Sequence, residues 1–131
     1  MDHELSIQQA ALQTGLSVHT LRYYERIGLM DPIGRAASGH RRYTESDLEW
    51  IILLTRLRTT DMPIAEMQRF AQLVRQGEGT IAERLVVLEA HQRKLCQQLH
   101  AIQLTLVVLD EKVAHYRAYK NAQLSESVEN N

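Results

Sequence analysis

The residues best suited to chemistry lie within residues 19–30, in the stretch HTLRYYERIGLM. Arg22 stands directly before Tyr23 and Tyr24, so a short segment carries a guanidinium, two hydroxyls and two aromatic rings. Guanidinium and hydroxyl groups hydrogen-bond to phosphates and base edges, and ring faces pack against sugars and thymine methyls. If the segment is a helix, Leu21 and Tyr24 share one side while Arg22 and Tyr23 turn to another. We therefore expect Tyr23 to be more exposed than Tyr24, and the alternative use of one tyrosine is packing in the core.

A second group of cations lies in residues 33–43, IGRAASGHRRY. Arg35, Arg41 and Arg42 stand there without an acidic residue, whereas the next stretch, TESDLE, holds three. Two short strands about the Gly/Ser/Ala loop would place these guanidiniums along a phosphate strand, and a solvated hairpin tip is the alternative. This placement matters because the net charge of the chain is −1, whereas nucleic-acid-binding domains are usually basic.

Composition excludes several other classes of protein. The chain has 131 residues, which suits one domain or a small domain with an appendage. Its longest strongly apolar run, WIILL, is far shorter than the ~20 residues that cross a membrane. The N-terminus has no apolar block after a basic region, so we expect a cytoplasmic protein without a signal peptide. No glycine-rich phosphate loop or catalytic motif is present, so we expect neither enzymatic activity nor a cofactor.

Short-range signals predict two helices joined by a tight turn within residues 5–29. Ser6 can cap the first helix, Gly15 can end it, and Ser17 can cap the second. Helix, short glycine-containing turn and helix form the helix-turn-helix pattern.

Two further helices follow the candidate strands. Thr44 and Asp47 have the spacing of a capping box, and the helix that they begin should run to about Thr59. Pro63 suits the start of another helix, which should end at the GEG of residues 77–79. The prediction for residues 1–76 is a mainly α, winged helix-turn-helix domain.

From Thr80 onward an apolar residue recurs at alternating spacings of four and three, which predicts a coiled-coil helix over residues 80–118. No second helix of comparable length is predicted, so its apolar side requires another copy of the chain, giving a homodimer. The tail, residues 119–131, lacks periodicity and is expected to be frayed or loosely docked. The predicted dimerisation residues are Ile81, Leu85, Leu88, Leu95, Leu99, Ile102, Leu106, Leu109 and Val113.

Residues 5–76 resemble the DNA-binding domain of the MerR family of bacterial transcription regulators. The family's T-G-[LV] turn is matched at residues 14–16, its R-[YF]-Y-[ED] motif at residues 22–25, and its G-L pair at Gly28 and Leu29. Its wing motif, an arginine followed by G-[YH]-R-x-Y, is matched by Arg35 and residues 39–43. The long helix is similar to the family's dimerisation helix, which pairs in an antiparallel coiled coil.

The resemblance implies a homodimer that binds a palindromic promoter element with an overlong spacer. By distorting this DNA the dimer would control transcription, with RNA polymerase as a partner through the shared promoter. The chain departs from the family pattern at His40, where tyrosine is frequent, and at Asp61, where glycine is frequent. Asp tolerates the left-handed backbone that this glycine position requires. The predicted DNA-binding residues are Ser17, His19, Thr20, Arg22, Tyr23, Tyr24, Arg35, His40, Arg41, Tyr43 and Arg58.

The stimulus is less evident than the DNA-binding role. Metal sensors of the family carry cysteines at the start of the long helix and after it, and this chain has none there, so no metal is expected. Family members that sense drugs append a large domain, for which about a dozen residues after the coiled coil would not suffice. Cys96 is a candidate sensor because His100 stands one helical turn away, and a small residue beside the seam is its alternative role. An unidentified small-molecule inducer remains a partner in this hypothesis.

A protein-binding adaptor is the alternative function, with the coiled coil as its working part and the winged domain as a docking module. The near-neutral charge favours it. Salt dependence separates the two, because phosphate contacts weaken steeply as salt rises.

Overall fold

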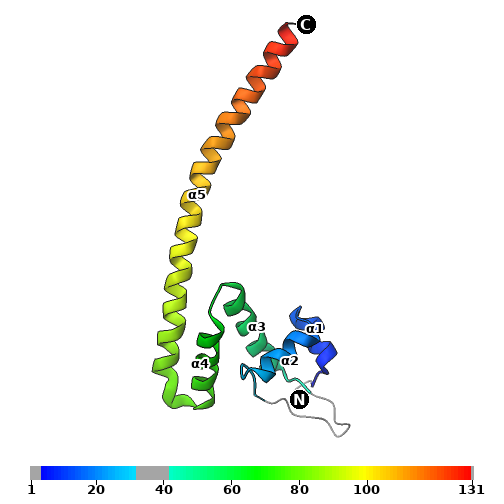
Figure 1. The fold of residues 1–131 in the computed structure, drawn as a ribbon, viewed down its shortest axis with the longest axis vertical. Coiled ribbons are helices and arrows are strands. Elements are labelled where there is room, and N and C mark those ends of the chain that lie inside the picture. Colours follow the sequence, from blue (N-terminus) through cyan, green and yellow to red (C-terminus); the bar gives the residue numbers. More distant parts are fainter. Residues whose placement is uncertain (1–3, 32–41, 131) are drawn as a thin grey trace. The chain divides into compact units, whose positions relative to one another are not determined.

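The computed structural model describes residues 4–31 and 42–130, and the described chain is mainly helical, as predicted (Figure 1). It forms two compact units, Met1–Glu89 and Ala90–Asn131. The helices in chain order are α1 (Ile7–Thr14), α2 (Val18–Arg26), α3 (Glu45–Thr59), α4 (Ile64–Arg75), the short 3-10 helix η1 (Glu78–Thr80) and α5 (Ile81–Glu129).

The predicted signals set the bounds of α1 and α2. Ser6 and Gln9 form a capping box at the start of α1, and Gly15 ends that helix with a left-handed φ of 74°. Ser17 caps α2 by accepting a hydrogen bond from the Thr20 backbone N–H at 3.0 Å. The helix-turn-helix prediction is therefore confirmed in its local detail.

The start of α3 and the turn after it also follow the prediction. The Thr44 N–H donates to the Asp47 carboxylate at 2.9 Å, and the Asp47 N–H donates to the Thr44 hydroxyl at 3.2 Å. After α3, Asp61 adopts a φ of 69°, the left-handed conformation expected of it. The chain thereby reverses between α3 and α4 without a glycine.

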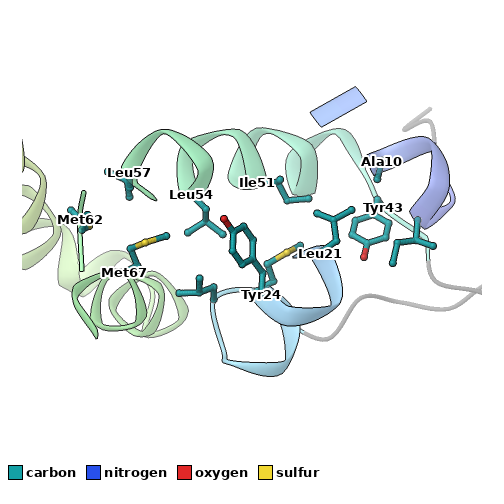
Figure 2. Close-up of a cluster of buried hydrophobic side chains, with 12 residues drawn as sticks. Ala10, Leu21, Tyr24, Tyr43, Ile51, Leu54, Leu57, Met62 and Met67 are labelled. Carbon is teal, nitrogen blue, oxygen red and sulfur yellow. The ribbon is translucent and has the colours of Figure 1, made fainter. Parts of the chain in front are cut away.

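The core of the N-terminal unit is formed by the inner faces of α1, α2, α3 and α4. Figure 2 shows Leu21 and Tyr24 of α2 directed toward Ile51 and Leu54 of α3. Tyr43 is fully buried in the same cluster. Its backbone forms an isolated antiparallel bridge with Leu5, at N···O distances of 2.8 and 2.7 Å. The remaining residues of the expected wing hairpin, 32–41, lie outside the described residues.

The last helix, α5, is longer than the sequence pattern predicts. It continues to Glu129, so the prediction of a frayed or loosely docked tail after residue 118 was wrong for residues 119–129. The apolar repeat ends there, but AYKNAQLSESVE contains neither glycine nor proline and consists largely of residues that helices accept readily. Among the described residues, no helix is both long and apolar enough to span a membrane.

Candidate nucleic-acid interface

The outer face of α2 presents cationic and aromatic side chains to solvent. His19, Arg22, Tyr23 and Arg26 are exposed on this helix. Tyr23 is 37% exposed and Tyr24 only 5%, which confirms the predicted difference between the two tyrosines. The Arg26 guanidinium lies over the Tyr23 ring at 5.6 Å from its centroid, a geometry that restrains both side chains. Arg26 was not among the predicted site residues, although its position one turn after Arg22 was a signal for it.

The N-terminal end of α2 lies beside this face. Ser17 is exposed and Thr20 is partly buried, and their hydroxyl oxygens are 2.9 Å apart. Both therefore contribute to the cap of the helix. The first N–H groups of a helix and its positive dipole end attract anions, so this end suits a phosphate contact.

Two predicted contact residues lie in the core instead of on this face. Tyr24 is buried because it falls three residues after Leu21 on the inner side of α2, and Tyr43, whose backbone bridges to Leu5, is buried in the core cluster. Burial raises the pKa of Tyr24 above its ordinary value of 10.0, while the positive charge of Arg58 acts in the opposite direction. The structure therefore places both rings in the core, and their assignment to direct DNA contact stays a prediction.

Side chains from α3 and α4 bind the backbone carbonyls at the C-terminal end of α2. Gln68 donates to the Ile27 carbonyl, and the Trp50 indole donates to the Leu29 carbonyl, each at 2.8 Å. Arg75 donates to the Gly28 carbonyl and also to Asp31, the latter at 2.5 Å. We call Trp50, Gln68 and Arg75 the α2 clamp. Because these bonds join residues at least 21 positions apart, no local sequence signal revealed them.

Arg58 lies at the end of α3 and is exposed, as a contact to DNA requires. Its positive charge opposes the effect of burial on the pKa of Tyr24. The Asp61 N–H donates to the Arg58 carbonyl at 3.1 Å, so the left-handed turn holds this end of the helix. The other predicted contacts, Arg35, His40 and Arg41, lie outside the described residues.

The predicted dimerisation residues form an apolar row along α5, which we call the α5 seam. Leu88 and Leu95 are partly buried, and the other seven members are 47–57% exposed in the single chain. Solvent-exposed apolar side chains in such a regular row require a partner surface.

The candidate sensor Cys96 is exposed, as is His100. Within residues 4–31 and 42–130, no group of three or more His, Cys, Asp or Glu side chains could hold a metal ion. The thiol and imidazole of one chain thus make no metal centre by themselves.

A cavity of about 430 Å³ lies between the segment after α2, the start of α3 and the end of α4. Its apolar lining includes Leu29, Trp50 and Val74, and its polar lining includes Asp31 and Glu49. The Trp50 ring is stacked on Phe70 with centroids 5.7 Å apart, which fixes this wall. The volume falls in the range of small-molecule sites.

Known proteins similar to this chain are transcription regulators. The MerR HTH family of regulatory proteins matches residues 5–73. An uncharacterized HTH-type transcriptional regulator from Haemophilus influenzae is 37% identical over 112 residues, which cover 86% of this chain and 83% of the relative.

Two solved structures share the fold over most of their length. The crystal structure of HiNmlR, a MerR family regulator lacking the sensor domain and bound to promoter DNA, aligns with a TM-score of 0.81 and 35% identity. That alignment covers 90% of this chain and 94% of HiNmlR. A protein from Listeria monocytogenes described as a MerR family transcriptional regulator aligns with a TM-score of 0.85 and 32% identity, over 97% of this chain and 99% of its own.

Proposed function

Because the chain belongs to the MerR family of transcription regulators, we propose that it binds a palindromic promoter element as a homodimer and controls transcription from that promoter. The observation that carries this proposal is the exposed face of α2, where Arg22, Tyr23 and Arg26 stand together. HiNmlR, which shares the fold, was crystallised bound to promoter DNA.

The exposed residues suit different parts of the DNA. Arg22 and Tyr23 would reach base edges and phosphates in the major groove, with His19 beside them. Ser17 and Thr20 would lie near a phosphate at the start of α2, and Arg58 would contact the backbone from the end of α3. Arg35, His40 and Arg41 would add backbone contacts from the segment between the described parts of the chain. Tyr24 and Tyr43 lie in the core beneath these residues.

The way in which α2 is held supports a mechanism based on DNA deformation. The Ser17 cap fixes one end of α2 and the α2 clamp fixes the other. A helix bound rigidly at both ends transmits force to the groove that it occupies. In a dimer, two such helices would bend and twist the DNA between the half-sites, bringing the elements of an overlong spacer into position for RNA polymerase.

The proposal includes a small-molecule inducer, whose identity the structure does not give. A small-molecule inducer would fit the cavity beside Trp50, whose walls are formed by the same helices that clamp α2. A ligand there would act on the position of α2 directly.

Replacement of Arg22 by alanine tests the proposal. Loss of a bidentate base contact costs about 1–3 kcal/mol, so Arg22→Ala should weaken binding to a selected promoter site by roughly 5- to 150-fold at constant salt. The matched control is Arg93→Ala, which removes an exposed arginine from α5 and should leave affinity unchanged.

Fluorescence anisotropy across a salt series completes this test. Wild-type affinity should fall linearly on a log–log plot as salt rises, because phosphate contacts release counterions. Equal affinity of Arg22→Ala and wild type, or binding that does not respond to salt, would support the adaptor function instead.

A further inference from the structure

The cavity beside Trp50 has apolar walls that suit a compact ligand. Leu29, Trp50, Leu53 and Val74 contribute to these walls. The Trp50 ring is stacked on Phe70, yet Trp50 is only partly buried, so part of its ring remains open to contact. The volume of about 430 Å³ lies in the lower part of the range of small-molecule sites. A small molecule with a flat apolar body would fit this space.

The polar lining of the same cavity is predominantly negative. Among the described lining residues are three carboxylates, those of Asp31, Asp47 and Glu49, and one guanidinium, that of Arg75. The start of α3 and the end of α4 both border the cavity, and their helix dipoles have opposite signs there, so the two dipoles offset each other. The excess of two negative charges therefore makes the cavity attractive to cations.

The bonds that these groups already make leave Glu49 available to a ligand. Asp47 accepts a hydrogen bond from the Thr44 N–H at 2.9 Å, as part of the cap of α3. Asp31 pairs with Arg75, but 72% of its side chain is exposed. Glu49 is exposed and has no hydrogen bond or ion pair with any residue that the structure describes. A positively charged group in the cavity would pair with Glu49 first and with Asp31 next.

We propose that this cavity binds a small organic cation, with a flat apolar body between Trp50 and Val74 and a positive head group directed toward Glu49 and Asp31. An aromatic amidinium has both features, because its N–H groups match a carboxylate and its ring packs against an indole. This inference rests on the proposed function, whose inducer it assigns to a chemical class.

A cation in this position would also act on the α2 clamp. Arg75 donates to Asp31 at 2.5 Å and to the Gly28 carbonyl, so one guanidinium contacts both a cavity carboxylate and the end of α2. A ligand cation beside Asp31 competes with Arg75 for that carboxylate. Occupation of the cavity is therefore coupled to the position of α2, and a coupling between two binding sites is reciprocal.

The full-length protein carries its own probe of the cavity, because Trp50 is the only tryptophan in the chain. The test titrates the protein, without DNA, with benzamidinium, with benzamide, which is similar in shape but neutral, and with benzoate, which is negative. Tryptophan fluorescence is corrected for collisional quenching with N-acetyltryptophanamide. We expect a saturable change with benzamidinium, at least about fivefold weaker binding of benzamide, and no saturable change with benzoate.

Glu49→Gln tests the role of charge in an exposed side chain whose substitution leaves the core intact. Benzamidinium should bind about fivefold more weakly to this variant, the upper range for an exposed ion pair, and benzamide should bind as before. The matched control is Glu45→Gln, the same change at an exposed residue of α3 outside the described lining, and it should bind benzamidinium like the wild type. Val74→Phe fills the cavity from α4 and should abolish the saturable change.

Three results would overturn the assignment to cations. The first is benzamide binding as tightly as benzamidinium, or benzamidinium binding undiminished in Glu49→Gln. The second is tighter binding of benzoate, which would make the cavity an anion site served by Arg75. The third is the absence of any saturable change with benzamidinium in the wild-type protein.

Promoter affinity separates this inference from the proposed function. Because the titration contains no DNA, a protein that binds a promoter fragment but not benzamidinium contradicts this inference alone. A protein that binds benzamidinium but no promoter fragment contradicts the proposed function alone. Where both bind, saturating benzamidinium should change promoter affinity more in the wild type than in Glu49→Gln, and equal affinities with and without it would overturn the competition with Arg75.

Discussion

Substitution of the two adjacent tyrosines of α2 should affect two different properties, stability for one and DNA affinity for the other. Tyr24 is 5% exposed and packs in the core, whereas Tyr23 is 37% exposed on the face proposed to contact DNA. We expect Tyr24→Ala to lower the stability of the N-terminal unit and Tyr23→Ala to lower DNA affinity with little effect on stability.

The magnitudes follow from the contacts of each ring. Truncation of a buried aromatic residue costs about 3–5 kcal/mol, from lost apolar burial and the cavity left behind. For Tyr23 the loss should be only about 0.5–1 kcal/mol, the strength of an exposed cation–π contact such as that with Arg26 at 5.6 Å. The expected difference in the free energy of unfolding between the two variants is therefore roughly 2–4 kcal/mol.

Urea unfolding followed by circular dichroism measures this difference, with the slope checked to be equal for both variants. Promoter affinity is then compared under conditions in which each variant is folded. A Tyr23→Ala variant as unstable as Tyr24→Ala would refute the division of the pair into surface and core. So would a Tyr23→Ala variant with undiminished affinity, because it would show that the exposed ring does not contact DNA.

Three further substitutions probe the support of α2. Gly28→Ala should lower the free energy of unfolding by about 1–2 kcal/mol, because residue 28 has a φ of 83°. The control is Gly79→Ala, where the added methyl also meets open space, and it should be nearly neutral in the same urea assay. Trp50→Phe keeps a ring beside Phe70 but removes the donor to the Leu29 carbonyl, so unfolding should become easier by about 1 kcal/mol; an unchanged midpoint would show that this bond adds nothing. Because burial raises the pKa of Tyr24, the unfolded chain ionises first as pH rises past about 10, and stability should fall there. Tyr24→Phe should reduce that fall as pH rises from about 9 to about 11, and an identical fall in both proteins would contradict the assigned cause.

Features set by neighbouring residues could be predicted from the sequence. The caps at Ser6, Ser17 and Thr44 depend on side chains three residues from the groups that they bond, so the pattern alone located the helix starts. The left-handed turn at Asp61 was also local. The burial of Tyr24 was indicated by its spacing from Leu21, but its neighbour and the family motif led to its assignment as a DNA contact.

Features set by long-range contacts could not be predicted. The backbone of Tyr43 pairs with that of Leu5, which is 38 positions earlier and has no sequence pattern that links it to Tyr43. The α2 clamp likewise depends on how α3 and α4 pack against the end of α2. The length of α5 was underestimated because the end of an apolar repeat was taken as the end of the helix. Helix propensity continues to Glu129 where the repeat does not.

Footprinting of the best DNA fragment selected by the purified protein tests the central claim most directly. The genome that encodes the protein supplies the fragments, and a reagent sensitive to unstacked bases is applied alongside the nuclease. We predict protection of a palindrome between the promoter hexamers, an overlong spacer, and enhanced reactivity at its centre where the DNA is distorted. If no fragment is enriched at low salt, the protein does not act as a DNA-binding regulator, and a protected site without enhanced reactivity would contradict the deformation mechanism.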